Sequence, residues 1–135
     1  MRDAVLAVLT ADSTLMTVLT GGFHSAVEIS RQTTPEAFDA DKELLPCGLL
    51  KLGTDIPTGP FPDSSQSALM TYFYQRAGYD VIDVALARVY TLLHELHVGN
   101  GIWQILWSNH VRDAEDDALG CAMAMSTYNV FRLQP

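Results

Sequence analysis

Residues 79–97, YDVIDVALARVYTLLHELH, carry the clearest secondary-structure pattern in the sequence. At 100° per residue, its apolar side chains fall on one stripe of a helix, whereas Asp83 and Arg88 fall away from it. That stripe consists of Ile82, Ala85, Leu86, Val89, Leu92, Leu93 and Leu96. Asp80 is a good N-cap, and the GNG tripeptide at 99–101 ends the pattern. We therefore expect one long central helix whose apolar face packs on a sheet.

The segments on both sides of this helix are predicted strands. Before it stand FHSAVEIS (23–30), LLPCGLLKLG (44–53), whose strand follows Pro46, and SALMTYFYQRAG (67–78). After it stand IWQILWSNHV (102–111) and CAMAMSTYNVFRL (121–133), which could form a hairpin around the acidic turn RDAEDDALG (112–120). Between the second and third strands, the prolines of TDIPTGPFPDSSQ (54–66) predict an irregular but stiff loop.

The N-terminal segment adds a helix or a helix pair. Apolar residues follow helical spacing around Val5–Leu9 and again around Leu15–Leu19, and Asp12 between them could cap the second helix. The predicted fold class is therefore α+β, with an N-terminal helix or helix pair and a mostly antiparallel sheet of about four to five strands. One long central helix packs on a face of that sheet, and residues 1–135 form a single domain.

The composition of the chain argues against several classes of function. The chain has 135 residues and a net charge of −8, which disfavours both sequence-specific nucleic-acid binding and docking on anionic membranes. The N-terminal segment does not have the pattern of a signal peptide, and no apolar run approaches the ~20 residues of a membrane span. We expect a soluble protein made in a cytoplasm. Cys47 and Cys121 each lie in an apolar run and are expected to be buried free thiols, with a disulfide between adjacent strands as the alternative.

Catalytic and metal-binding motifs are weak. His94 and His97 in HELH stand at i and i+3 near a predicted helix C-terminus, where a protonated histidine interacts well with the helix dipole. A zinc site would need a third ligand, and His24 or His110 could supply one in the fold. The acidic residues Asp113, Glu115, Asp116 and Asp117 lack the glycine and the spacing of a calcium loop, so a solvated turn is expected. No nucleophile motif is present. We expect no enzyme activity, no catalytic residue, no cofactor and no metal site.

The order of the elements resembles the tail terminator (tail completion) proteins of long-tailed bacteriophages. The matching pieces are AVLAVLTADSTLMTVLTGGFH, SRQTTPEAF before LLPCGLLKLG, the Pro/Gly loop leading into SSQSALMTYFYQ, the helix VIDVALARVYTLLHEL, and the closing strands IWQILWSNHV and STYNVFR. The resemblance covers nearly the whole chain, as a pattern of elements and lengths rather than a signature motif.

This resemblance implies a structural virion protein that caps the tail tube as a homo-hexameric ring. Such a ring ends tube polymerisation and presents a surface for the head–tail connector or stopper protein. Its other partner is the major tail tube protein, and DNA passes through without specific binding. Its place would be the tail or neck of the virion, assembled in the host cytoplasm. Candidate subunit or partner contacts are Phe61 on the proline-rich loop and the scarce cations Arg76 and Arg88.

Three alternatives stay open. The protein could be another neck component, such as a head-completion or stopper protein. It could be a small metal-dependent enzyme that uses His94 and His97. It could also be an acidic inhibitor that imitates DNA.

Overall fold

The computed structural model describes residues 2–57, 64–97 and 102–133. It confirms the α+β class, the N-terminal helix pair and the central helix. The elements in chain order are α1 (Arg2–Ala11), α2 (Ser13–Val18), β1 (Phe23–His24), the 3-10 helix η1 (Pro35–Ala37), β2 (Cys47–Pro57), β3 (Ser64–Gln75), α3 (Asp80–Leu93), β4 (Ile102–Asp116) and β5 (Cys121–Leu133). As predicted, Asp12 caps α2, because its carboxylate accepts the Leu15 backbone N–H at 2.9 Å.

The described strands form one five-stranded sheet in the order β1-β2-β3-β5-β4. The short β1 runs parallel to β2, and the other neighbours are antiparallel. The predicted hairpin of β4 and β5 is confirmed, but its acidic turn is shorter than predicted. Glu115 and Asp116 still pair with Ala122 and Cys121, so they belong to β4 rather than to a solvated turn.

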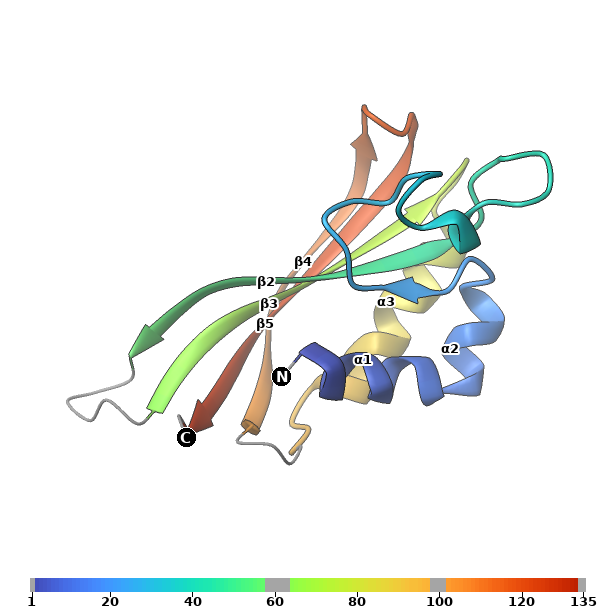
Figure 1. Ribbon diagram of the computed structural model, residues 1–135. Coiled ribbons are helices and arrows are strands. Elements are labelled where there is room, and N and C mark those ends of the chain that lie inside the picture. Colours follow the sequence, from blue (N-terminus) through green and yellow to red (C-terminus); the bar gives the residue numbers. More distant parts are fainter. Residues whose placement is uncertain (1, 58–63, 98–101, 134–135) are drawn as a thin grey trace.

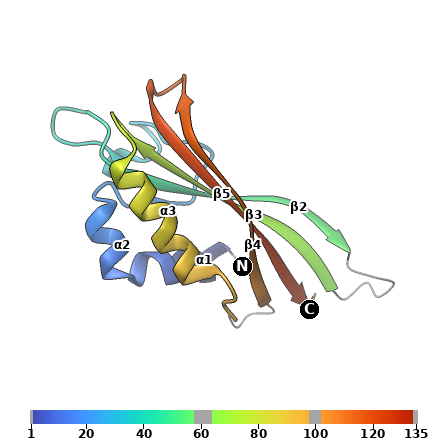
Figure 2. The ribbon, with the colours of Figure 1, turned by 180° about the vertical axis from the view of Figure 1, so that it is seen from behind.

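Helices cover one face of the sheet, and only toward one end of the long strands (Figures 1 and 2). The main core lies between that face and the helices, where Leu69 and Phe73 of β3 are fully buried together with Leu86 and Val89 of α3. At the other end, β2, β3 and β5 project past the helices (Figure 1). None of the helices in the described part of the chain combines the length and the apolar composition that a membrane-spanning helix needs.

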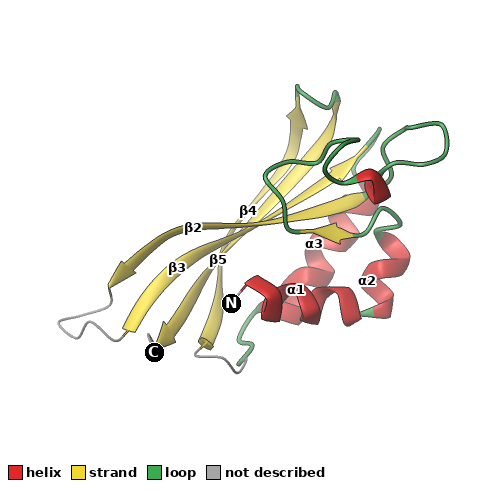
Figure 3. Ribbon diagram, viewed as in Figure 1, coloured by secondary structure: helices red, strands yellow, loops and turns green. Residues whose placement is uncertain are grey.

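The opposite face is covered, near the same end, by the segment 25–46, which is mostly loop (Figure 3). Here the predicted strand over 23–30 is wrong beyond His24. Phe23 and His24 pair with Gly48 and Leu49, and the Phe23 ring lies so close to Gly48 that a Cβ there would approach it to 2.4 Å. The chain then bends, so Ile29 enters a second apolar cluster while Val27 stays 82% exposed.

The two cysteines are buried free thiols, as predicted. β3 lies between β2 and β5, and Tyr74, the partner of Cys47, pairs with Met123 rather than with Cys121, so the two cysteines are at least two strand spacings apart, that is at least about 9–10 Å. A disulfide needs Cα atoms within about 7 Å, which excludes the alternative without a backbone movement. Burial raises the pKa of Cys47 to about 12 and that of Cys121 to about 11, so both stay protonated thiols.

The start of α3 differs from the prediction in its cap. Asp80 is the first helical residue, and Tyr79 occupies the N-cap position without a side-chain cap bond. The cap comes instead from Gln75 at the end of β3, whose Oε1 accepts the backbone N–H of Val81 at 3.0 Å and of Ile82 at 3.2 Å. Its Nε2 donates to the Asp80 carboxylate at 2.7 Å, which lowers the pKa of Asp80. A side chain from the sheet thus fixes where the helix begins.

Candidate functional site

Three surfaces of the molecule carry unusual side-chain arrangements. The first is the projecting end of the sheet, which we call the arm: residues 53–57 of β2, 64–68 of β3 and 129–133 of β5. In it, the Asp55 carboxylate accepts a hydrogen bond from the hydroxyl of Ser67, which is fully buried, and pairs with Arg132 at 3.2 Å. Ile56, next in β2, is 55% exposed. The arm therefore combines an internal polar network with an exposed apolar side chain.

The second surface lies where α3 meets β4, the edge strand of the sheet. Tyr90 of α3 stacks on His94, with ring centroids 4.9 Å apart, and meets the Trp107 ring edge-on at 5.8 Å. The indole N–H of Trp107 donates to His110 Nδ1 at 3.2 Å. Burial, and next the positive charge of Arg112, lower the pKa of His110, which keeps this ring neutral and able to accept. The result is an aromatic cluster whose Trp107 is 40% exposed.

The HELH motif (94–97) lies in this region. The prediction that the central helix continues through it is wrong. α3 ends at Leu93 because the chain turns to pair with the edge of β4: the Glu95 N–H donates to the Ile105 carbonyl at 2.7 Å, and the Ile105 N–H to the Leu96 carbonyl at 3.1 Å. His94 Nδ1 accepts the backbone N–H of Trp107 at 3.0 Å, so one of its two possible ligand atoms is already engaged. His97 is exposed beyond the helix.

The histidines that could complete a metal site do not converge on HELH. His24 lies at the other edge of the sheet and contacts the Gly21 carbonyl at 2.7 Å. His110 does approach His94, since both contact Tyr90, but its Nδ1 is bonded to the Ser126 hydroxyl at 2.7 Å. Across the described ranges, no three His, Cys, Asp or Glu side chains group in a way that could hold a metal ion.

The Ser126 hydroxyl and His110 Nδ1 lie 2.7 Å apart, a distance typical of a serine nucleophile and its base. No sequence motif predicts this pair, because the two residues are 16 positions apart. A serine nucleophile must reach its substrate, and Ser126 is fully buried on β5. Its hydroxyl also lies 3.5 Å from the Asn109 carbonyl, so it bridges two strands. The pair therefore links β4 to β5, and the burial of the Ser126 hydroxyl excludes its attack on an external substrate in this conformation.

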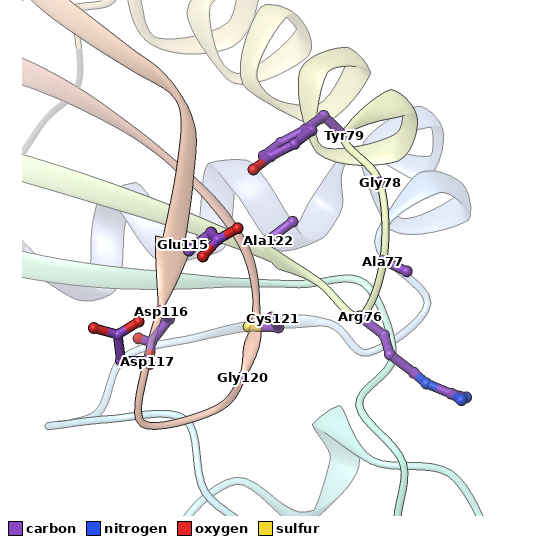
Figure 4. Close-up of a pocket in the computed structure, with 10 residues that line it drawn as sticks. All are labelled: Arg76, Ala77, Gly78, Tyr79, Glu115, Asp116, Asp117, Gly120, Cys121 and Ala122. Carbon is purple, nitrogen blue, oxygen red and sulfur yellow. The ribbon is translucent and has the colours of Figure 1, made fainter.

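The third surface is a hollow of about 370 Å³ between the β3–α3 turn and the tip of the β4–β5 hairpin. Figure 4 shows Tyr79 pointing from the start of α3 toward the hairpin, whereas Arg76 extends away from the carboxylates. The Tyr79 hydroxyl donates to the Ala114 carbonyl at 3.0 Å. Burial, and then the negative charges of Glu115 and Asp113, raise the pKa of Tyr79, so the phenol stays protonated as a donor. This hollow is an acidic surface built around a structural tyrosine.

The predicted contact residues occupy different environments. Arg88 forms a two-pronged pair with Asp12, with Nε 2.9 Å and Nη2 2.7 Å from the carboxylate oxygens. This pairing ties α3 to the start of α2 and lowers the pKa of Asp12 to about 2. Arg76 is largely exposed and pairs with Glu43. Phe61 lies outside the described residues. Both arginines have partners within the chain, and their role in contacts between subunits stays a prediction.

Comparison with known proteins identifies the fold. A solved structure titled "Virion of native gene transfer agent (GTA) particle" contains a chain that matches all of this chain and 95% of its own length, with a TM-score of 0.67 and 14% sequence identity. At this identity the match shows a shared fold. No protein-family model matches the sequence, and no curated protein is significantly similar to it.

Proposed function

We propose that this protein is a structural component of a phage-like virion, and more specifically a tail terminator. The observation that carries the proposal is the match of fold over the full chain to a chain of a gene transfer agent virion. The sequence resemblance to tail terminators supports the same assignment. In this role the protein closes the tail tube as a ring of six copies and presents a surface to the head connector.

The described surfaces suit an assembly protein better than an enzyme. The Ser126 hydroxyl is buried, and His94 Nδ1 already accepts the backbone N–H of Trp107, so neither atom is free to react. By contrast, the arm exposes Ile56 and strand backbone beyond the protein's own helices (Figure 2). We propose that the arm contacts other virion proteins, because an apolar side chain on a projecting strand gains stability when a partner covers it.

The test is electron microscopy of the purified protein mixed with tail tubes assembled from the major tail tube protein. A terminator is expected to add ring-shaped density at one tube end and to halt elongation when fresh tube protein is supplied. Tubes that elongate at the same rate, with bare ends, would contradict the proposal. Binding to a portal–adaptor complex instead would favour the alternative of another neck protein.

A matched pair of variants tests the arm. Ile56→Asp replaces the exposed apolar side chain of the arm with a carboxylate, and Thr17→Asp introduces the same charge at an exposed position of α2. We expect Ile56→Asp to weaken binding to its virion partners and Thr17→Asp to leave it unchanged. Equal binding by both variants would show that the arm is not part of the contact surface.

A further inference from the structure

A second hollow, of about 380 Å³, opens beside the aromatic cluster at the edge of the sheet. Its lining consists of Ala87, Tyr90, Thr91, Trp107, His110 and Arg112. The chain carries 16 Asp and Glu residues and a net charge of −8, yet this lining contains one cation, the rings of Tyr90, Trp107 and His110, and no carboxylate. The hollow is thus an apolar and positively charged spot on an acidic protein. Such a spot suits a partner segment that pairs an apolar side chain with a carboxylate.

The walls of this hollow are already fixed in place. Trp107 is held by its indole hydrogen bond to His110 and by the bond from its backbone N–H to His94. An aromatic side chain that is ordered before docking loses little conformational entropy when a partner binds. Within the described residues, the exposed Arg112 makes no ion pair. Its charge is therefore available to an incoming carboxylate.

A segment with the required chemistry lies at the opposite edge of the same sheet. Val27 is the most exposed large apolar side chain among the described residues, at 82%, and the exposed Glu28 follows it. The bend that presents them is held by buried Ile29 and by the Thr33 hydroxyl, which donates to the Glu28 carbonyl at 3.2 Å. The Glu28 carboxylate has no ion-pair partner in the described ranges. This bend therefore presents an apolar side chain, Val27, and the Glu28 carboxylate next to each other in a fixed conformation.

We propose that the bend at Val27–Glu28 of one copy docks in the α3–β4 hollow of a second copy. Val27 packs against Trp107 and Tyr90, and the Glu28 carboxylate pairs with the Arg112 guanidinium. The two surfaces differ and lie beyond β1 at one edge and on β4 at the other, so the contact is head-to-tail. Contacts of this type generate rings when the rotation between copies closes. This contact would join neighbouring copies in the proposed ring, and the closure of that ring rests on the proposed function.

Cross-linking provides the direct test. Chains carrying Val27→Cys and chains carrying Thr91→Cys, a lining position, are mixed and oxidised. The native Cys47 and Cys121 are buried, so they do not compete. We expect a disulfide-linked heterodimer to form at least ~10-fold faster than in a control mixture of Val27→Cys with Thr17→Cys, because only the docked pair is held at high effective concentration. Equal rates in the two mixtures would overturn the proposed contact.

A charge exchange tests the ion pair by a different readout. Glu28→Arg and Arg112→Glu each place like charges in the contact, so each variant alone is expected to self-associate at least ~10-fold more weakly than the original chain. An equimolar mixture of the two restores opposite charges at every contact and is expected to recover association in sedimentation velocity. A mixture that associates no better than the single variants would overturn the pairing.

The outcomes separate this contact from the proposed function. Rings or caps on tube ends without the Val27→Cys–Thr91→Cys cross-link would refute the contact and leave the terminator function standing. The cross-link without any effect on tail tubes would support the contact and refute the terminator function.

Discussion

The two ends of β3 have the same strand geometry, but one end buries a polar side chain and the other an apolar one. Ser67 and Phe73 lie on the same face of this strand, pair with β5 in one unbroken register, and are both fully buried. Phe73 packs in the core beneath the helices and meets the Phe23 ring edge-on at 6.0 Å. Ser67 instead donates a hydrogen bond to Asp55 in the arm. The helix-covered half therefore supplies most of the apolar stabilisation, while polar contacts order the arm.

The largest effect is expected in the helix-covered half. Phe73→Ala removes a fully buried ring from the main core, and such a change lowers the free energy of unfolding by about 3–5 kcal/mol. Urea denaturation followed by circular dichroism measures this loss. A loss below about 1 kcal/mol would show that the helices contribute less to stability than their packing indicates.

A smaller, pH-dependent effect is expected where α3 is tied to α2. The pKa of Asp12 is about 2 in the folded protein against 3.8 ordinarily, so its pairing with Arg88 stabilises the fold above about pH 4. That stabilisation is lost as the pH falls through about 2. Arg88→Ala should therefore lower the melting temperature at pH 7 and have little effect near pH 2. Thermal melts across pH 2–7 measure the difference, and a pH-independent loss would contradict this account.

A conservative control distinguishes charge from geometry at the same position. Arg88→Lys keeps the positive charge but cannot form both bonds to Asp12. Its melting temperature at pH 7 should fall between those of the original chain and Arg88→Ala.

In the arm, Ser67→Ala should lower the free energy of unfolding by about 1 kcal/mol. The hydroxyl is a single hydrogen-bond donor, and the Asp55 side chain is 53% exposed, so water can replace the lost bond. Hydrogen exchange of the arm amides should quicken in this variant, while exchange in α3 stays unchanged. Equal acceleration in both regions would show that the arm and the helix-covered half unfold as one unit.

The smallest effect is expected at the exposed position of the arm. Ile56→Ala should change the free energy of unfolding by less than about 0.5 kcal/mol, because the side chain is 55% exposed. The same urea titration as for Phe73→Ala measures it. A loss comparable with that of Phe73→Ala would mean that the isolated protein already buries Ile56 in solution, for example against another copy.

Elements whose signal is local and periodic could be predicted from the sequence. The apolar stripe of α3 is confirmed at Ile82, Ala85, Leu86, Val89 and Leu93, which are all fully buried, because helical periodicity directly reports the face that a helix covers. The Asp12 cap and the existence of strands β2, β3, β4 and β5 are also confirmed. Each depends on residues close together in the chain. The predicted irregular loop over 54–66 is wrong at both of its ends, because β2 runs on to Pro57 and β3 begins at Ser64.

Features that join distant segments could not be predicted from the sequence, because they depend on tertiary packing. The end of α3 at Leu93 follows from pairing with Ile105, its start from the amide of Gln75, and the partner of Arg88 is Asp12, 76 residues away. The surface cluster of Tyr90, Trp107 and His110 was equally hidden, because a bulge between Trp107 and Asn109 shifts the alternation of β4. Local sequence does not encode which strand edge a chain meets after a helix ends, since that contact exists only once the sheet and the helices have packed together.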